Sequence, residues 1–167
     1  AIVASLLVGA LALAGYLSMK GTRGCSVLSA VCLMLFSGVM IQAQMGLIEM
    51  HFHIFSALAL TIIYRDWLPV FAGAAFIAVH HLVLTGLQMS GFDIGGMPLM
   101  LFNHESTWGM ALLHAAFVVF EAGILMFFAR QMGVERQQAL QMMAIVRAFD
   151  QKKDLSGRLS VQNGNAG

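Results

Sequence analysis

The sequence predicts an all-α protein: a polytopic bundle of transmembrane helices that continues into a cytoplasmic signalling helix. Of its residues, 59% are hydrophobic and only 10% are charged, a balance far from that of soluble domains. Nine Lys and Arg and eight Asp and Glu make 17 charged residues, and eight of these follow Arg130. The chain therefore divides into an apolar block and a shorter polar one.

Crossing about 30 Å of hydrocarbon takes about 20 apolar residues in a helix. Runs of about this length lie between polar breaks and predict five spans: Ala1–Met19, Cys25–Met45, Leu47–Tyr64, Leu68–Gln88 and Thr107–Ala129. The third run is short and contains Glu49. Because the sequence starts abruptly in apolar residues without a methionine, we expect a sixth span upstream.

The distribution of Lys and Arg predicts the orientation in the membrane. Lys20 and Arg23 mark one short connection as cytoplasmic and Arg65 marks another, whereas the break at Gly46 and the stretch 89–106 contain no Lys or Arg. This pattern predicts a multi-pass protein of the bacterial inner membrane with a cytoplasmic C-terminus.

Two domains are expected, a sensor bundle over residues 1–130 and a signalling helix with the start of an output linker over 131–167. Apolar positions in Gln131–Phe149 recur with a period close to 3.5, which is typical of a packed helical stalk. We expect this helix to form a homodimer and to relay a signal through Arg130, Met143, Val146 and Phe149. The alternative is an amphipathic extension lying on the inner membrane surface.

Ionisable residues inside spans are costly and are therefore candidates for function. At about 1.5 Å per residue, His51, His81 and His114 all lie roughly 6–10 Å below the outer ends of their spans. His80 and His81 project about 100° apart, so one of them is expected to face the bundle centre. His81 is favoured because small residues, Ala74 and Ala78, share its face.

Three imidazoles at one depth predict a site for a transition metal such as copper, zinc, iron or nickel. We expect His51, His81 and His114 as ligands, and the thioether of Met110 within reach would favour copper. Further ligands or residues that orient the rings are Glu49, His53, His80 and Glu121. Two alternatives remain, haem b held between two imidazoles and histidines that only form polar contacts between helices.

Four motifs, IEMHF, YRDW-P, VHHL and WGM-LLHAA, occur between residues 42 and 130. Together they resemble a membrane-embedded sensor module of bacterial methyl-accepting chemotaxis proteins and diguanylate cyclases. Glu49 and His51 fall in the first motif, His80 and His81 in the third, and His114 in the fourth. The segment DLSGRLSVQNGNAG is similar to the end of a HAMP-like linker.

This resemblance implies a non-enzymatic sensory input domain with a copper site that responds to reactive oxygen such as superoxide, followed by a chemotaxis or diguanylate cyclase output domain. Two other classes stay open, a membrane enzyme or haem-binding electron carrier and a metal transporter. Internal repeats and broken helices typical of transporters are not evident in the sequence. A net charge of +1 gives no reason to expect nucleic acid as a partner.

Overall fold

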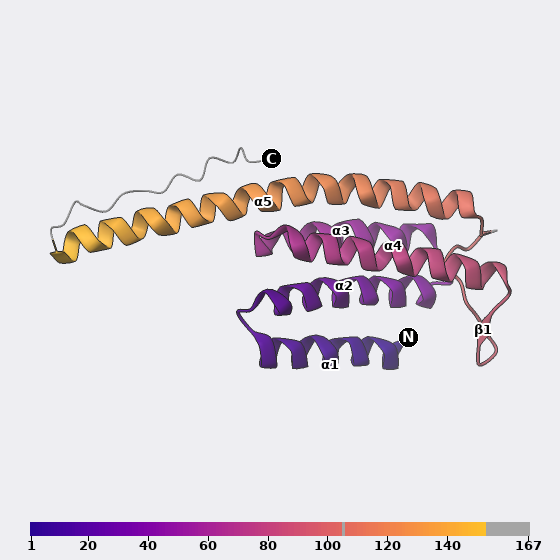
Figure 1. Cartoon of the computed structure of the whole chain (residues 1–167). Helices are drawn as coiled ribbons and strands as arrows, with labels where there is room; N and C mark the ends of the chain where they lie inside the picture. Colours follow the sequence, from indigo (N-terminus) through magenta and orange to yellow (C-terminus); the bar gives the residue numbers. More distant parts are fainter. Residues whose placement is uncertain (105, 153–167) are drawn as a thin grey trace.

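The computed structural model describes residues 1–104 and 106–152, which form a helical bundle with one small hairpin (Figure 1). The α-helices are α1 (Ile2–Met19), α2 (Arg23–Ala43), α3 (Phe52–Leu60), α4 (Trp67–Met89) and α5 (Trp108–Lys152). Single turns of 3₁₀-helix, η1 (Ile48–His51) and η2 (Thr61–Tyr64), flank α3. Strands β1 (Asp93–Ile94) and β2 (Met97–Pro98) pair antiparallel. The predicted all-α membrane bundle is confirmed.

The number of long spans differs from the five that we predicted. Within the described residues, four helices are long and apolar enough to cross a membrane, namely α1, α2, α4 and α5. The remaining segment, Ile48–Tyr64, is a shorter apolar helix. Because its two 3₁₀ turns rise about 2.0 Å per residue, the segment still extends roughly 29 Å, close to the hydrocarbon thickness.

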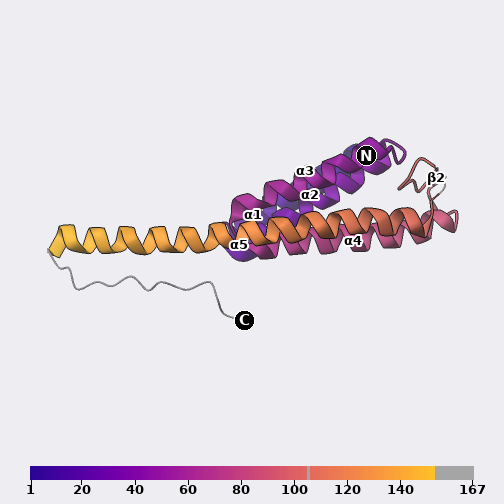
Figure 2. The same cartoon turned by 90° about the horizontal axis from the view of Figure 1, so that it is seen from above.

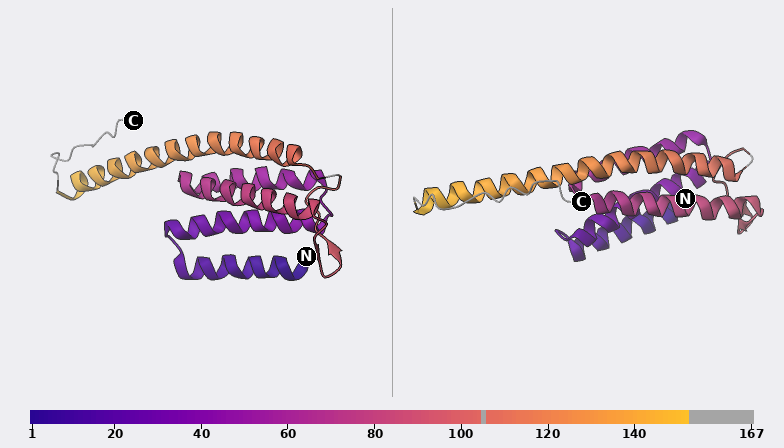
Figure 3. Two further views of the ribbon diagram at one scale, coloured as in Figure 1. Left: turned by 45° about the vertical axis from the view of Figure 1, so that its right-hand side comes forward. Right: turned by 45° about the horizontal axis from the view of Figure 1, so that its top comes forward.

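The core lies among α2, α3, α4 and α5, where large side chains such as Met34, Ile54, Leu58 and Ile77 are fully or almost fully buried. Helix α1 packs against α2 on the outside of the bundle (Figures 1 and 3). Only Gly15 of α1 is buried. The outward faces of the helices carry exposed large apolar side chains, as lipid-facing surfaces do.

Helix α5 is continuous from Trp108 to Lys152 and extends well beyond the other helices (Figure 2). The predicted span and the predicted signalling helix are therefore parts of one helix. Arg130 does not interrupt it, and the domain boundary there stays a prediction. The HAMP-like segment 154–167 lies outside the described residues.

Candidate metal-binding site

Three imidazoles meet at the end of the bundle that carries the hairpin. They come from three separate elements: His51 from η1, His81 from α4 and His114 from α5. The ring centroids lie 5.4 Å apart for His51 and His81, 5.2 Å for His51 and His114, and 6.4 Å for His81 and His114. His51 and His81 are buried, and His114 is half-buried. We call these three residues the His cluster.

Each ring of the His cluster is tied to its own helix by the same bond. The Nδ1 atoms of His51, His81 and His114 lie 3.3, 3.0 and 2.8 Å from the carbonyl oxygen four residues earlier. A carbonyl can only accept, so Nδ1 carries a proton, and in the neutral form of such a ring Nε2 keeps its lone pair. This bond from the second nitrogen is typical of metal-bound histidine. Among the described residues, His51 Nε2 is buried without a hydrogen-bond partner.

A fully buried phenylalanine closes the His cluster from the side of the loop between α4 and α5. The Phe102 ring stacks on His51 at 5.4 Å with an interplanar angle of 7°, and it lies 5.1 Å from the His114 ring. Stacking of this kind fixes the plane of the His51 ring. The backbone around Phe102, residues 98–103, folds back onto the bundle, and we call it the covering loop.

Two glutamines hold the covering loop. Gln88 Oε1 accepts from the backbone N–H groups of Leu101 and Phe102 at 2.8 and 3.1 Å, and its Nε2 donates to the Phe102 carbonyl at 2.7 Å. Gln42 accepts from Met100 N–H at 2.9 Å and donates to the Pro98 carbonyl at 3.0 Å. Satisfying buried backbone groups in this way is what permits an irregular loop against apolar helices.

Gly46, in the turn between α2 and η1, also holds the covering loop in place. Its carbonyl accepts from Asn103 N–H at 2.9 Å, and its φ is +75°. A Cβ at this position would lie 2.7 Å from the carbonyl carbon of Phe102. A residue without a side chain is therefore required here, both for the backbone conformation and for the close approach.

The other residues predicted for the site are placed around the His cluster and not in it. Glu49 is exposed, and His53 Nδ1 lies 2.7 Å from Ser37 Oγ, which itself donates to the Leu33 carbonyl. Met110 provides the carbonyl that accepts from His114. Within the described part of the chain, Glu121 Oε2 is buried without a hydrogen-bond partner.

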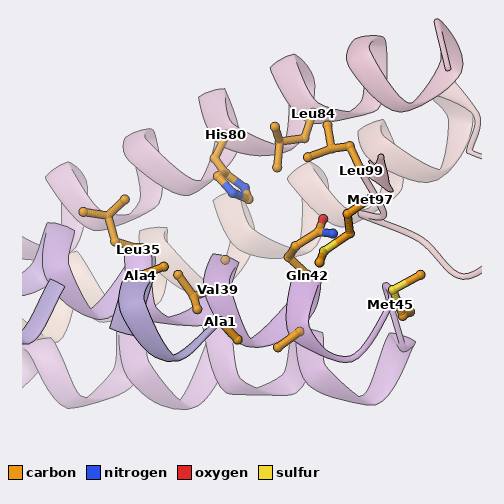
Figure 4. Close-up of a pocket in the computed structure, with 12 residues that line it drawn as sticks. Ala1, Ala4, Leu35, Val39, Gln42, Met45, His80, Leu84, Met97 and Leu99 are labelled. Atoms are coloured by element: carbon orange, nitrogen blue, oxygen red, sulfur yellow. The ribbon is translucent and has the colours of Figure 1, made fainter. Parts of the chain in front are cut away.

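His80 projects into a separate cavity of about 450 Å³ beside α2 and α4 (Figure 4), and its ring centroid lies 5.5 Å from that of His81. The cavity is largely apolar, with Leu35, Val39 and Leu84 in its wall. His80 Nδ1 is buried and has no hydrogen-bond partner among the described residues. His81 lies beside both His51 and His114, and its choice over His80 as a ligand stays a prediction.

The donor atoms of the His cluster suit a metal ion. Two of the three separations between its ring centroids match those expected around one ion. Ligands at about 2.0–2.1 Å from one ion would place imidazole centroids about 5.2–5.5 Å apart. The separation of 6.4 Å between His81 and His114 exceeds this range by about 1 Å. Accordingly, no group of three His, Cys, Asp or Glu residues in the described ranges holds its donor atoms ready for a metal ion.

Sequence reasoning missed Phe102, Gln88 and Gly46. The available signal was an apolar run, Met-Pro-Leu-Met-Leu-Phe, in a loop otherwise rich in Gly, Asp and Ser. Apolar residues in a loop predict burial, although they do not predict what the loop covers.

The sequence matches no family model, and no solved structure matches it. Among curated proteins, "Transducer protein Htr8" of Halobacterium salinarum is 30% identical over 124 residues, which are 72% of this chain and 18% of the transducer. The chain thus spans about a fifth of the length of the curated relative it matches. Most of this chain is therefore similar to one part of a transducer protein.

Proposed function

We propose that the chain is the membrane-embedded sensory input domain of a signal-transducing receptor, that it is not an enzyme, and that its His cluster binds a metal, copper first. The receptor role is supported by the similarity to a transducer protein and by the four apolar helices. The metal is supported chiefly by one observation, three neighbouring imidazoles whose Nδ1 atoms are all occupied by backbone carbonyls. That arrangement leaves Nε2 of each ring as the donor atom.

Copper is preferred because imidazole and thioether donors suit it and because it changes oxidation state. The proposed stimulus is therefore a redox or reactive-oxygen signal such as superoxide. Haem b, the alternative cofactor of a sensor or electron carrier, would need a flat gap between two rings. His51 and Phe102 lie 5.2 and 5.1 Å from the His114 ring, and this crowding favours a single ion over a porphyrin.

The signal would leave the site through α5. An approach of about 1 Å between His81 and His114 would bring these rings to the spacing of the other two pairs and draw α5 toward α4. A packed helix transmits such a displacement along its length, and Lys152 lies about 57 Å from His114 at 1.5 Å per residue. A coupling free energy of about 1–3 kcal/mol between site and output would be enough.

The polar part of α5 is the proposed dimer stalk of a protein in the inner membrane with its C-terminus in the cytoplasm. Met143, Val146 and Phe149 are 48%, 58% and 44% exposed, so the apolar positions of the stalk have no partner within the described part of this chain. Pairing with a second copy would bury them. A chemotaxis or diguanylate cyclase output domain would then follow the stalk.

The function is tested in a hybrid receptor that joins the C-terminal end of this chain to a chemotaxis signalling domain, in cells without other receptors. Swimming bias is followed while copper is chelated and restored, with and without a superoxide source. We expect a copper-dependent response from the unmodified hybrid and from His104→Ala, and none from His114→Ala. A response that is the same with copper chelated, or in His114→Ala, would overturn the proposal.

A further inference from the structure

At the end of the bundle opposite the His cluster lies an open cleft of about 730 Å³, between the start of α4 and the part of α5 just beyond the last apolar span. Four arginines line it: Arg23, Arg65, Arg130 and Arg136. Among the described residues, Asp66 is the only acidic residue in its wall, so four arginines and one aspartate give this part of the cleft a net charge of +3. Its volume is in the range of ligand sites, well above what a single small ion fills.

The arginines of this cleft are not equivalent. Arg23 donates from Nε and Nη2 to the two carboxylate oxygens of Asp66, and its guanidinium lies 5.7 Å from the centre of the Trp67 ring. Its charge is therefore already neutralised. Arg65, Arg130 and Arg136 are exposed and form no ion pair with a carboxylate in the described part of the chain.

The backbone holds Arg65 close to Arg130 and Arg136. Arg65 has a left-handed backbone conformation, with φ +52°. Its carbonyl oxygen meets α5 at Gly133, where a Cβ would lie only 2.7 Å away. Because a glycine lets the turn approach this closely, Arg65 sits directly beside the helix that carries Arg130 and Arg136.

We propose that this cleft binds a phosphate group, and that its source is the headgroup of an anionic phospholipid. Guanidinium groups bind phosphate through paired hydrogen bonds, and several around one cleft favour phosphate over a carboxylate. Exposed apolar side chains continue from the cleft along the bundle, including Trp67 and Phe71 at 43% and 50% exposure, and would accompany the acyl chains. Basic pockets between transmembrane helices are typical headgroup sites.

The test uses the fluorescence of Trp67 in the whole chain, in detergent, with Trp108→Phe making it the single tryptophan. Dihexanoyl phosphatidylglycerol and dihexanoyl phosphatidylcholine are titrated in parallel, and inorganic phosphate is titrated alone. We expect saturation by phosphatidylglycerol at a concentration at least fivefold lower than by phosphatidylcholine. If inorganic phosphate saturates at the same concentration as phosphatidylglycerol, the phosphate chemistry holds and a free phosphate compound is the source.

Matched variants separate this cleft from general surface charge. Arg130→Gln with Arg136→Gln should remove the preference for phosphatidylglycerol. Lys20→Gln, which removes a charge at the same end of the bundle, and Arg147→Gln, further along α5, should change binding less than twofold. Arg130→Lys with Arg136→Lys, with unchanged circular dichroism, should bind phosphatidylglycerol with intermediate affinity. The proposal would be overturned if both lipids saturated at the same concentration and phosphate gave no response. It would also be overturned if Lys20→Gln lost the preference for phosphatidylglycerol as fully as Arg130→Gln with Arg136→Gln.

Discussion

The two ends of the bundle use polar residues in opposite ways. At one end, three histidines are enclosed by Phe102 and the covering loop, and each ring is fixed by a bond to its own helix. At the other end, four arginines line an open cleft, and one of them, Arg23, has an ion-pair partner within the described residues. A closed site with fixed neutral donors suits a small ion, and an open cationic site suits a larger solvated anion.

Helix α5 is common to both ends. It supplies His114 to one and Arg130 to the other, about 24 Å apart along the helix axis. Any displacement of α5 at the His cluster therefore also changes the cleft, where Gly133 touches the Arg65 carbonyl. The two sites are expected to influence one another, since both contact the same rigid helix.

The largest expected effect is loss of metal at the closed end. His51→Ala, His81→Ala and His114→Ala should each reduce bound copper to less than about a tenth of the unmodified level, because two imidazoles alone bind far more weakly than three. Copper per protein is measured by elemental analysis after dialysis. His104→Ala, in the exposed part of the loop, is the control and should keep its copper. Equal losses in His104→Ala would contradict the assignment of the ligands.

A smaller effect is expected where the covering loop meets the bundle. Gly46→Ala should lower the free energy of unfolding by about 2 kcal/mol or more, because the left-handed conformation alone costs about 1–2 kcal/mol and the methyl would also collide with the Phe102 backbone. Denaturant unfolding in detergent measures it. Gly123→Ala, where a Cβ meets nothing within 4 Å, is the matched control and should not destabilise. Similar stability of both variants would show that the loop does not depend on this contact.

The smallest effect belongs to the open end and depends on pH. The hydrogen bond from Arg23 holds the pKa of Asp66 below its usual value. A lowered pKa stabilises the fold above the unfolded value of about 4, and this stabilisation disappears as the pH falls through the folded value. Because the Arg23 side chain of this pair is half exposed to solvent, the contribution of the pair to stability is expected to be small.

Asp66→Asn isolates this charge, because asparagine still caps α4 through the backbone N–H of Leu68. The unmodified protein should be the more stable of the two at pH 7, and the difference should shrink as the pH falls below about 4. Thermal unfolding over a series of pH values from 7 downward measures the difference. A difference that stays constant over the whole series would show that the hydrogen bonds of Asp66, and not its charge, account for its effect.

The sequence predicted the helices and the meeting of the three histidines for related reasons. Apolar length defines a span, and depth within a span places a side chain at a given height, so residues of equal depth on packed helices can meet. The third segment was predicted as a regular span because composition does not reveal the 3₁₀ turns at both of its ends.

Contacts between distant segments could not be predicted in the same way. The stacking of Phe102 on His51 depends on a loop whose conformation is determined by Gln42, Gln88 and Gly46. The pairing of Arg23 with Asp66 joins residues 43 positions apart. Neither has a periodic pattern in the sequence, and each depends on how the helices pack.

Elemental analysis combined with an absorption spectrum of the detergent-purified protein tests the metal site most directly. We expect close to one copper per chain and no Soret band. A stoichiometric haem spectrum would identify the alternative cofactor, and protein that takes up no metal after copper is supplied would contradict the assignment of the His cluster as a metal site.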